Sequence, residues 1–230
     1  GMALQGKIPF ATTFSVFTCM RAVEQVRNSI CYANLNVNVV GTHSGLETGG
    51  DGGTHQGIED IAIMRALPNM TVFAPSTPVC TRAVTREMAA YDGPSYMRLG
   101  KDAAPELYEA GETFPMGGSK TLRQGKDLTI IACGNMVWRS LEAAKILAEE
   151  GVDVRVIDMY SIKPIDKEAI IQAAKETRGI LTVEDHNVLG GLGGAVAEVV
   201  CEFAPAKLLR LGLQDVFGRS GKAQKVLEAY

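Results

Sequence analysis

The sequence predicts an α/β protein with two doubly wound domains, each a parallel sheet covered by helices. Two observations predict this fold class. Short apolar segments alternate with amphipathic segments along most of the 230 residues, and strands that alternate with helices are typical of parallel sheets. The alternation lapses once, over residues 99–124, where Pro and Gly interrupt the chain. We therefore expect a first domain over residues 1–100, a linker over residues 101–125 and a second domain over residues 126–230.

In the first domain, helical periodicity follows the first apolar segment, where Met20, Val23, Val26 and Ile30 recur at steps of three and four residues. Another helix is expected to begin near Thr77, because a proline stands in its first turn. The expected strands are 8–13, 37–40, 71–74 and 95–98, and the expected helices are 18–32, 57–66 and one from 77.

The second domain shows the same alternation with clearer helix ends. Gly151 is a favoured helix-terminating residue, and Asp166 stands at the start of a helix. The expected strands are 128–132, 152–157, 180–183 and 208–211, and the expected helices are 137–150, 166–177, 192–203 and 220–230.

The composition excludes several classes of protein. The chain has 23 basic and 26 acidic residues, so it lacks the basic excess of a nucleic-acid binder. It has no run of about 18 apolar residues, which a membrane span needs, and its first residues do not resemble a secretory signal. We therefore expect a soluble, cytoplasmic protein.

Five cysteines are scattered along the chain without CxxC spacing and without a zinc-type cluster of Cys and His. This pattern indicates neither a disulfide framework nor a structural metal. We expect buried free thiols that pack as small apolar side chains. They are Cys19, Cys31, Cys80, Cys133 and Cys201.

The segment 41–56 is the strongest candidate for a functional site. It follows an apolar strand and leads into a helix, so it lies where open α/β sheets bind ligands. Six glycines over residues 41–53 let the backbone approach a ligand. His43, Asp51 and His55 supply two imidazoles and a carboxylate, which suit a polyhydroxylated phosphorylated substrate and proton transfer. The alternative is a long surface loop with incidental histidines.

Three other features each allow two interpretations. Phe14 and Phe17, after the first strand, could stack on a flat heterocycle, although such a pair is more often core. Arg98, at a strand end, could bind a phosphate or form a surface ion pair. Gly190–Gly194 misses the dinucleotide-binding spacing, so we expect tight packing there rather than nucleotide binding.

Together these residues resemble the transketolase family. Residues 6–99 resemble its pyrimidine-binding domain through GKIPFATTFSVF, VVGTHSGLETGGDGGTHQGIEDIAIMRALPNMTVFAPS and GPSYMRLG. Residues from 127 onward resemble its C-terminal domain through KDLTIIACGNMV, SIKPID and VEDHNVLGGLGGAVAE. The resemblance covers nearly the whole chain and is greatest to the small, C-terminal subunit of split transketolases.

The resemblance implies a thiamine diphosphate cofactor, with Mg²⁺ bound by a partner chain. Phe14 and Phe17 match the aromatic residues that stack on the aminopyrimidine of the cofactor. Many transketolases have a third aromatic residue where this chain has Met20, so the stack is expected to be thinner here. The cofactor implies carbanion chemistry on a ketose carbonyl.

The resemblance also implies substrate contacts in the transfer of a two-carbon ketol unit between sugar phosphates, a reaction of the pentose phosphate pathway. His55 and Asp51 match residues that contact substrate hydroxyls near the reacting carbons. His43 and Arg98 match groups that hold the sugar phosphate.

Parts of the family's active site have no counterpart in these 230 residues. The family's activating glutamate lies just upstream of the segment that matches residues 1–10, and none of Glu24, Glu47 and Glu59 matches it. The diphosphate- and metal-binding domain is also absent. We therefore expect missing flanking sequence, a chain that is inactive alone, and assembly with a large transketolase subunit as a homodimer or heterotetramer.

Three alternatives remain. The chain could be a non-catalytic dimerisation module from a truncated gene, which the upstream sequence would decide. It could also be the β subunit of a 2-oxoacid dehydrogenase, but His43 and the THQ segment suit a phosphosugar better than an oxoacid. A fragment of a deoxyxylulose-phosphate synthase is disfavoured because that family usually has Arg at the position of Phe17 and no histidine at position 43.

Overall fold

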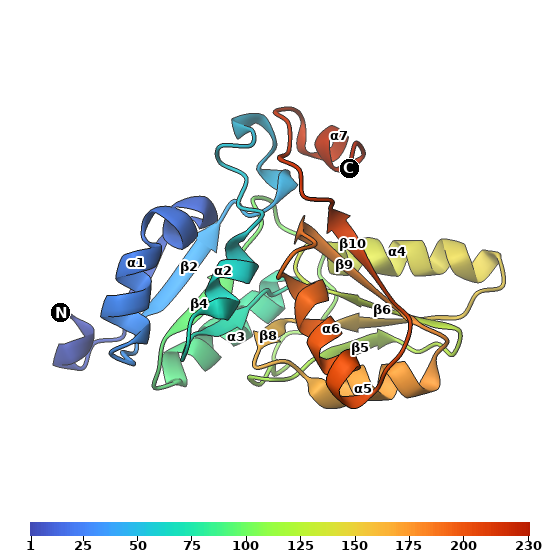
Figure 1. Cartoon of the computed structure of the whole chain (residues 1–230), viewed down its shortest axis with the longest axis horizontal. Coiled ribbons are helices and arrows are strands. Elements are labelled where there is room, and N and C mark those ends of the chain that lie inside the picture. The colour runs from blue at the N-terminus through green and yellow to red at the C-terminus, as the bar shows by residue number, and fades with distance from the viewer.

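Two five-stranded sheets lie next to each other in the computed structural model, which describes residues 1–230 (Figure 1). The strand order is β1-β2-β4-β3-β8 in the first sheet and β10-β9-β6-β7-β5 in the second. The strands are β1 (Phe10–Phe14), β2 (Asn38–Thr42), β3 (Thr71–Phe73), β4 (Ser95–Arg98), β5 (Lys120–Arg123), β6 (Leu128–Ala132), β7 (Val154–Asp158), β8 (Ser161–Lys163), β9 (Ile180–Asn187) and β10 (Leu208–Leu213).

Helices cover both faces of each sheet, which confirms the predicted α/β class. A single hydrophobic core joins the two sheets on one face, where Val39 and Ile61 belong to the same cluster as Ile131 and Val196. The opposite faces carry separate cores. The helices are α1 (Val23–Gln25), α2 (Asp60–Ala66), α3 (Pro78–Ala90), α4 (Met136–Glu149), α5 (Lys167–Glu176), α6 (Leu192–Phe203) and α7 (Ala223–Leu227). The other helical turns are η1 (Ala3–Gln5), η2 (Phe17–Arg21), η3 (Val26–Cys31) and η4 (Leu46–Asp51).

Both sheets are mixed rather than purely parallel. β5 pairs antiparallel with β7, and β8 pairs antiparallel with β3, so a strand from the second half of the chain completes the first sheet. β5 lies within residues 101–125, which the sequence predicts as a linker. The Lys163 ammonium, at the end of β8, donates to the carbonyls of Arg65 and Leu67 at 2.9 and 2.6 Å. The first sheet therefore depends on both halves of the chain.

The segment expected as one regular helix over residues 18–32 contains two wider turns. The amide of Ala22 donates to the carbonyl of Phe17 at 3.1 Å, and the amide of Tyr32 donates to that of Arg27 at 2.8 Å. These i→i+5 bonds define π-helical turns, η2 and η3, on either side of α1. The helical path is as predicted, but its hydrogen-bond spacing is not.

Four of the five cysteines are buried free thiols, as predicted, whereas Cys201 is exposed. Cys201 lies near the end of α6, on a face that no other element covers in this chain. No helix in the structure is both long enough and apolar enough to span a membrane.

Candidate active site

The parallel strands of the first sheet bring distant residues to one edge. Phe14 ends β1 and is paired with Thr42, which ends β2. His43 follows directly, and the rest of the glycine-rich segment, residues 43–56, extends beyond this edge. Because parallel strands all present their carboxyl ends on the same side, side chains from β1 and β2 meet there.

Four side chains at this edge form what we call the aromatic–imidazole cluster: Phe14, Phe17, His43 and His55. The rings of Phe14 and His43 are stacked, with centroids 4.0 Å apart and planes inclined by 7°. Phe17 stacks on Phe14 at 5.8 Å, and His55 meets both phenyl rings edge-on at 6.0 and 5.6 Å. All four residues are half-buried, so the cluster is ordered by mutual contact and remains open to a ligand.

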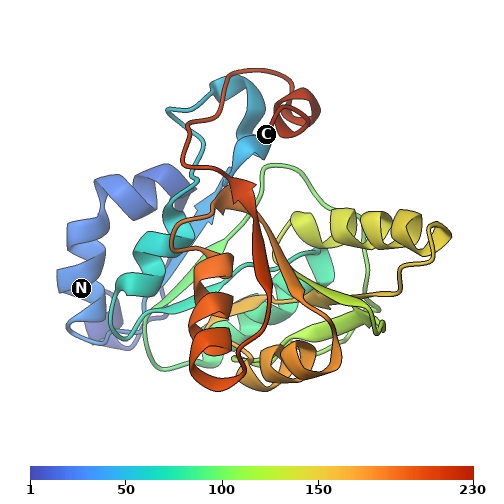
Figure 2. The same cartoon turned by 45° about the vertical axis from the view of Figure 1, so that its right-hand side comes forward.

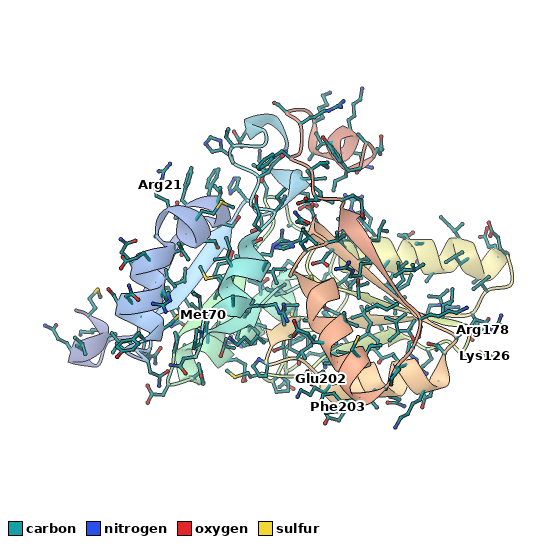
Figure 3. All side chains as sticks on the ribbon, viewed as in Figure 1. Arg21, Met70, Lys126, Arg178, Glu202 and Phe203 are labelled. Atoms are coloured by element: carbon teal, nitrogen blue, oxygen red, sulfur yellow. The ribbon has the colours of Figure 1, made fainter.

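A cation flanks the outer side of this cluster. The guanidinium carbon of Arg21 lies 4.5 Å from the centroid of the Phe17 ring, and Figure 3 shows Arg21 at the outer end of the helical segment. A guanidinium over an aromatic face is attracted by the ring quadrupole. This contact places a positive charge over the ring of Phe17.

Both imidazoles in the cluster leave one ring nitrogen free. His43 Nδ1 bonds Thr42 Oγ1 at 3.1 Å, and His55 Nδ1 bonds Thr54 Oγ1 at 2.9 Å. Neither Nε2 makes a hydrogen bond within the chain. A neutral imidazole with one nitrogen anchored and the other free can accept or donate a proton at the free position.

The backbone of His43 adopts a left-handed conformation, with φ of 53°. This region is unfavourable for residues other than glycine and persists where the surroundings hold it. The Thr48 hydroxyl supplies such a contact, because it donates to the His43 carbonyl at 2.6 Å. Sequence periodicity carries no signal for this conformation.

Asp51 lies at the end of η4 and is exposed. No hydrogen bond joins it to either imidazole, and its charged neighbour is Lys101, whose Nζ lies 3.7 Å from Asp51 Oδ2. Lys101 Nζ also donates to the Thr48 carbonyl at 3.2 Å. Lys101 is thus a cation beside the glycine-rich segment that sequence reasoning missed. Its position three residues beyond the end of β4 is the signal that could have found it.

Arg98 does not join this group. It is 5% exposed, and its Nε donates to both carboxylate oxygens of Asp60 at 3.1 and 3.0 Å. Its Nη2 donates to the carbonyls of Asp185 and Gly57 at 2.6 and 3.3 Å. A buried guanidinium that is committed to a carboxylate and two carbonyls has little capacity for a further anion, so the geometry argues against the expected phosphate role. The alternative of a surface ion pair is wrong, because the pair is buried.

Arg98 belongs instead to a buried junction between the sheets, formed by Asp60, Tyr96, Arg98, Glu184 and His186. Asp60 also accepts from the Tyr96 hydroxyl at 2.7 Å. The carboxylate of Glu184 accepts from the amides of Leu192 and Gly193 at the start of α6. Gly191 has no room for a Cβ, which would overlap this carboxylate, so the glycines at 190–194 serve packing, as predicted.

Burial shifts the two titratable side chains that β9 contributes to the junction. Removal from water raises the pKa of Glu184 to about 7, against the lowering effect of its two amide donors. Burial also lowers the pKa of His186 to about 4, although the Asp60 carboxylate opposes that shift. His186 is therefore neutral near pH 7. The third histidine of the chain is a structural group.

No group of three or more His, Cys, Asp and Glu side chains is arranged to hold a metal ion. The polar side-chain atoms of the aromatic–imidazole cluster are the imidazole nitrogens of His43 and His55. This set suits hydrogen bonding and proton transfer more than metal ligation.

Comparison with known proteins agrees with this fold. The family model of the transketolase pyrimidine-binding domain matches residues 1–106. The family model of the transketolase C-terminal domain matches residues 117–230. This α/β chain contains both domains and therefore belongs to the transketolase family.

Three similar proteins carry only part of a transketolase. A protein of Methanocaldococcus jannaschii, named as a transketolase C-terminal section, is 49% identical over 100% of this chain and 73% of its own length. A 6-deoxy-6-sulfo-D-fructose transketolase subunit of Clostridium sp. (strain MSTE9) is 40% identical over 100% of this chain and 71% of its own length. A solved split-gene transketolase, described as an inactive β4 tetramer, superposes with a TM-score of 0.94 at 48% identity, over 99% of this chain and 73% of that chain.

Proposed function

We propose that this chain is the small subunit of a thiamine-diphosphate-dependent transketolase that transfers a two-carbon ketol unit between sugar phosphates. The observation that carries the proposal is the aromatic–imidazole cluster, half-open at the carboxyl ends of β1 and β2. The similarity to a transketolase subunit and to a transketolase C-terminal section supports it.

The cluster fits one half of the cofactor. The ring planes of Phe14 and Phe17 are inclined by only 15°, and half-buried aromatic rings of this kind are stacking partners for a pyrimidine ring. A diphosphate with Mg²⁺ needs oxygen ligands, and we assign these to a partner chain with a diphosphate-binding domain. When bound, thiamine diphosphate would supply a nucleophilic carbon for the ketose carbonyl and the electron sink that cleavage of the adjacent carbon–carbon bond requires.

The chain's own residues bind the sugar and move its protons. His55 Nε2 exchanges a proton with a substrate hydroxyl, because this nitrogen is free while Nδ1 is held by Thr54. Asp51 accepts a hydrogen bond from a further hydroxyl. His43 contacts the phosphate end of the sugar, and we replace Arg98 in that role by Lys101, the cation beside Asp51.

Reconstitution tests the proposal. The chain, extended by any upstream sequence its gene encodes, is mixed with its cognate large subunit, thiamine diphosphate and Mg²⁺, and ketol transfer from a ketose phosphate to an aldose phosphate is measured. We expect transfer only when both chains are present. Absence of transfer in the complete mixture would contradict the proposal, and turnover of a 2-oxoacid instead would favour the dehydrogenase alternative.

A matched variant links the activity to the cluster. Phe14→Ala removes the ring that stacks with both Phe17 and His43, and we expect it to raise the cofactor concentration needed for half-maximal activity. Tyr32→Ala removes an aromatic side chain that is 87% exposed, far along the same helical segment, and serves as the control. An equal response of the two variants would contradict the cofactor role of Phe14.

A further inference from the structure

A carboxylate from the second half of the chain, that of Asp185, contacts the glycine-rich segment of the candidate active site. We propose that Asp185, at the end of β9, is a positioning residue that holds the turn η4 and thereby the substrate-binding side chains of the glycine-rich segment. The geometric part of this inference stands on the contacts alone, and its catalytic part rests on the proposed function.

Asp185 caps η4 from outside its own segment. The residue before η4 is Gly45, which has no side chain to accept from the first amides of the turn. Asp185 Oδ1 accepts from the amide of Leu46 at 2.9 Å, and Oδ2 accepts from the amide of Glu47 at 3.4 Å. Amides at the start of a helical turn need such acceptors, and an Asp side chain is among the best of them. Here the Asp comes from 139 positions along the chain.

The glycine at position 45 makes room for this cap. Its φ of 74° favours glycine, and a Cβ there would overlap the carboxylate of Asp185. Asp185 itself is held from two sides. Asn135 Nδ2, at the start of α4, donates to Asp185 Oδ2 at 3.2 Å, and Arg98 Nη2 donates to the Asp185 carbonyl at 2.6 Å. The carboxylate is therefore anchored independently of the turn that it caps.

The turn passes this placement on to substrate-binding groups. Thr48, within η4, holds the left-handed backbone of His43 through its hydroxyl. Asp51 is the last residue of η4 and lies two positions beyond Gly49, whose non-helical backbone kinks the turn. The segment after β10 supports the same turn, because the amide of Gly221 donates to the Gly49 carbonyl at 3.4 Å and Ser220 Oγ donates to the Gly50 carbonyl at 2.6 Å. Figures 1 and 2 both show α7 beside η4.

Hydrogen exchange of individual amides tests the geometric part without any assay of activity. We expect Asp185→Ala to accelerate exchange at Leu46 and Glu47 roughly five- to tenfold, because both amides lose their acceptor. Asp166→Ala is the matched control, since Asp166 caps α5 through the amide of Ala169 at 3.0 Å in the same half of the chain. It should accelerate exchange at Ala169 and leave Leu46 and Glu47 unchanged. Equal exchange at Leu46 and Glu47 in the two variants would overturn the inference.

A conservative variant keeps the test decisive if Asp185→Ala does not fold. Asp185→Asn retains one acceptor oxygen, so we expect one of the two amides to stay protected while the other exchanges faster. Unchanged protection of both amides would show that the carboxylate does not cap the turn.

Kinetics in the reconstituted mixture test the catalytic part. We expect Asp185→Ala to raise KM for the sugar phosphate roughly tenfold. Asp185→Asn should raise KM much less, and Asp166→Ala should leave KM unchanged. Faster exchange with unchanged KM would overturn the positioning role. If Leu46 and Glu47 exchange faster but even the unmodified chain transfers no ketol unit in the reconstituted mixture, the proposed function is contradicted. The capping contact of Asp185 is then still supported.

Discussion

Two clusters of polar and aromatic side chains lie at the carboxyl ends of neighbouring strands and differ mainly in what surrounds them. The aromatic–imidazole cluster is half-buried, and both of its histidines keep a free Nε2. In the buried junction, Asp60 and His186 are 0% exposed, and the donors of Arg98 are directed at a carboxylate and two carbonyls. Both clusters contain histidine and aromatic rings, yet only the first keeps imidazole nitrogens free of hydrogen bonds within the chain.

Residue type and position on a strand are therefore not sufficient to distinguish a candidate binding site from a structural hydrogen-bond network. Hydrogen-bond capacity that the protein leaves unused separates them, because a ligand must find free donors and acceptors. Substitutions in and around the two clusters are therefore expected to affect different properties, activity at the first and stability at the second.

His55→Ala is expected to reduce turnover in the reconstituted mixture about 10²- to 10⁴-fold, the usual contribution of a general acid or base. The free energy of unfolding should change little, because the half-buried His55 side chain makes edge contacts to Phe14 and Phe17 and one exposed hydrogen bond to Thr54. Initial rates at saturating substrate and urea unfolding check the two parts. Full turnover in this variant would remove His55 from the chemistry.

Arg98→Ala is expected to lower the free energy of unfolding by about 3–5 kcal/mol, because it leaves the Asp60 carboxylate buried without its cation. Chemical denaturation measures the loss. Arg178→Ala is the matched control, because Arg178 also pairs with an aspartate, Asp127, but its side chain is 79% exposed. Arg178 lies at the far end of the second sheet (Figure 3). The control should lose at most about 1 kcal/mol. Similar losses in the two variants would contradict the structural role of Arg98.

Glu184→Gln tests the junction through pH. Because the folded pKa of Glu184 is raised to about 7 from 4.5, the ionised carboxylate opposes folding. The protonated carboxyl group of Glu184 contributes fully to stability below about pH 4.5, and this contribution is lost as the pH rises through 7. Relative to the unmodified chain, Glu184→Gln should therefore gain stability between pH 4.5 and 7.5, by roughly 3 kcal/mol for such a shift.

Unfolding midpoints at several pH values measure this gain. Glu202→Gln, on the exposed end of α6 (Figure 3), is the control and should follow the unmodified chain at every pH. A constant offset between Glu184→Gln and the unmodified chain would show that burial does not shift this carboxyl group.

Lys101→Ala is expected to raise KM for a phosphorylated ketose about tenfold, equivalent to about 1.4 kcal/mol, with little effect on an unphosphorylated one. Lys126→Ala, at the right-hand edge of the molecule in Figure 3 beside Arg178, should change neither value. If Lys101→Ala weakens both ketoses equally, the lysine does not bind the phosphate.

Local sequence signals were sufficient for much of the fold. α6 was predicted at its observed bounds, because apolar residues recur with helical spacing there, and β4 was predicted over the same four residues. β5 and β8 were not predicted, because they pair antiparallel at sheet edges and lie outside the strand–helix alternation on which the prediction rests. Long-range pairing decided them.

The candidate site shows the same limit. The glycine content and the two histidines indicated the segment 41–56, and the structure brings His43 and His55 to Phe14 and Phe17. The surroundings of Arg98 could not be predicted, since its partners Asp60 and Asp185 lie 38 and 87 positions away. Whether a charged side chain is buried depends on partners that are distant in the sequence.

The pairing of β8, from the second half of the chain, with β3 of the first sheet limits how the two domains can be recombined with those of other proteins. β8 covers the outer side of β3, so a polypeptide that ends near residue 106 would expose the N–H and C=O groups of that strand beside the apolar side chains of Val72 and Phe73. An open edge of this kind recruits strands from other molecules. A chimera that takes its two domains from different parents would need to match Ser161–Lys163 to the β3 of the other parent, and the smallest transferable cassette is the pair of domains together.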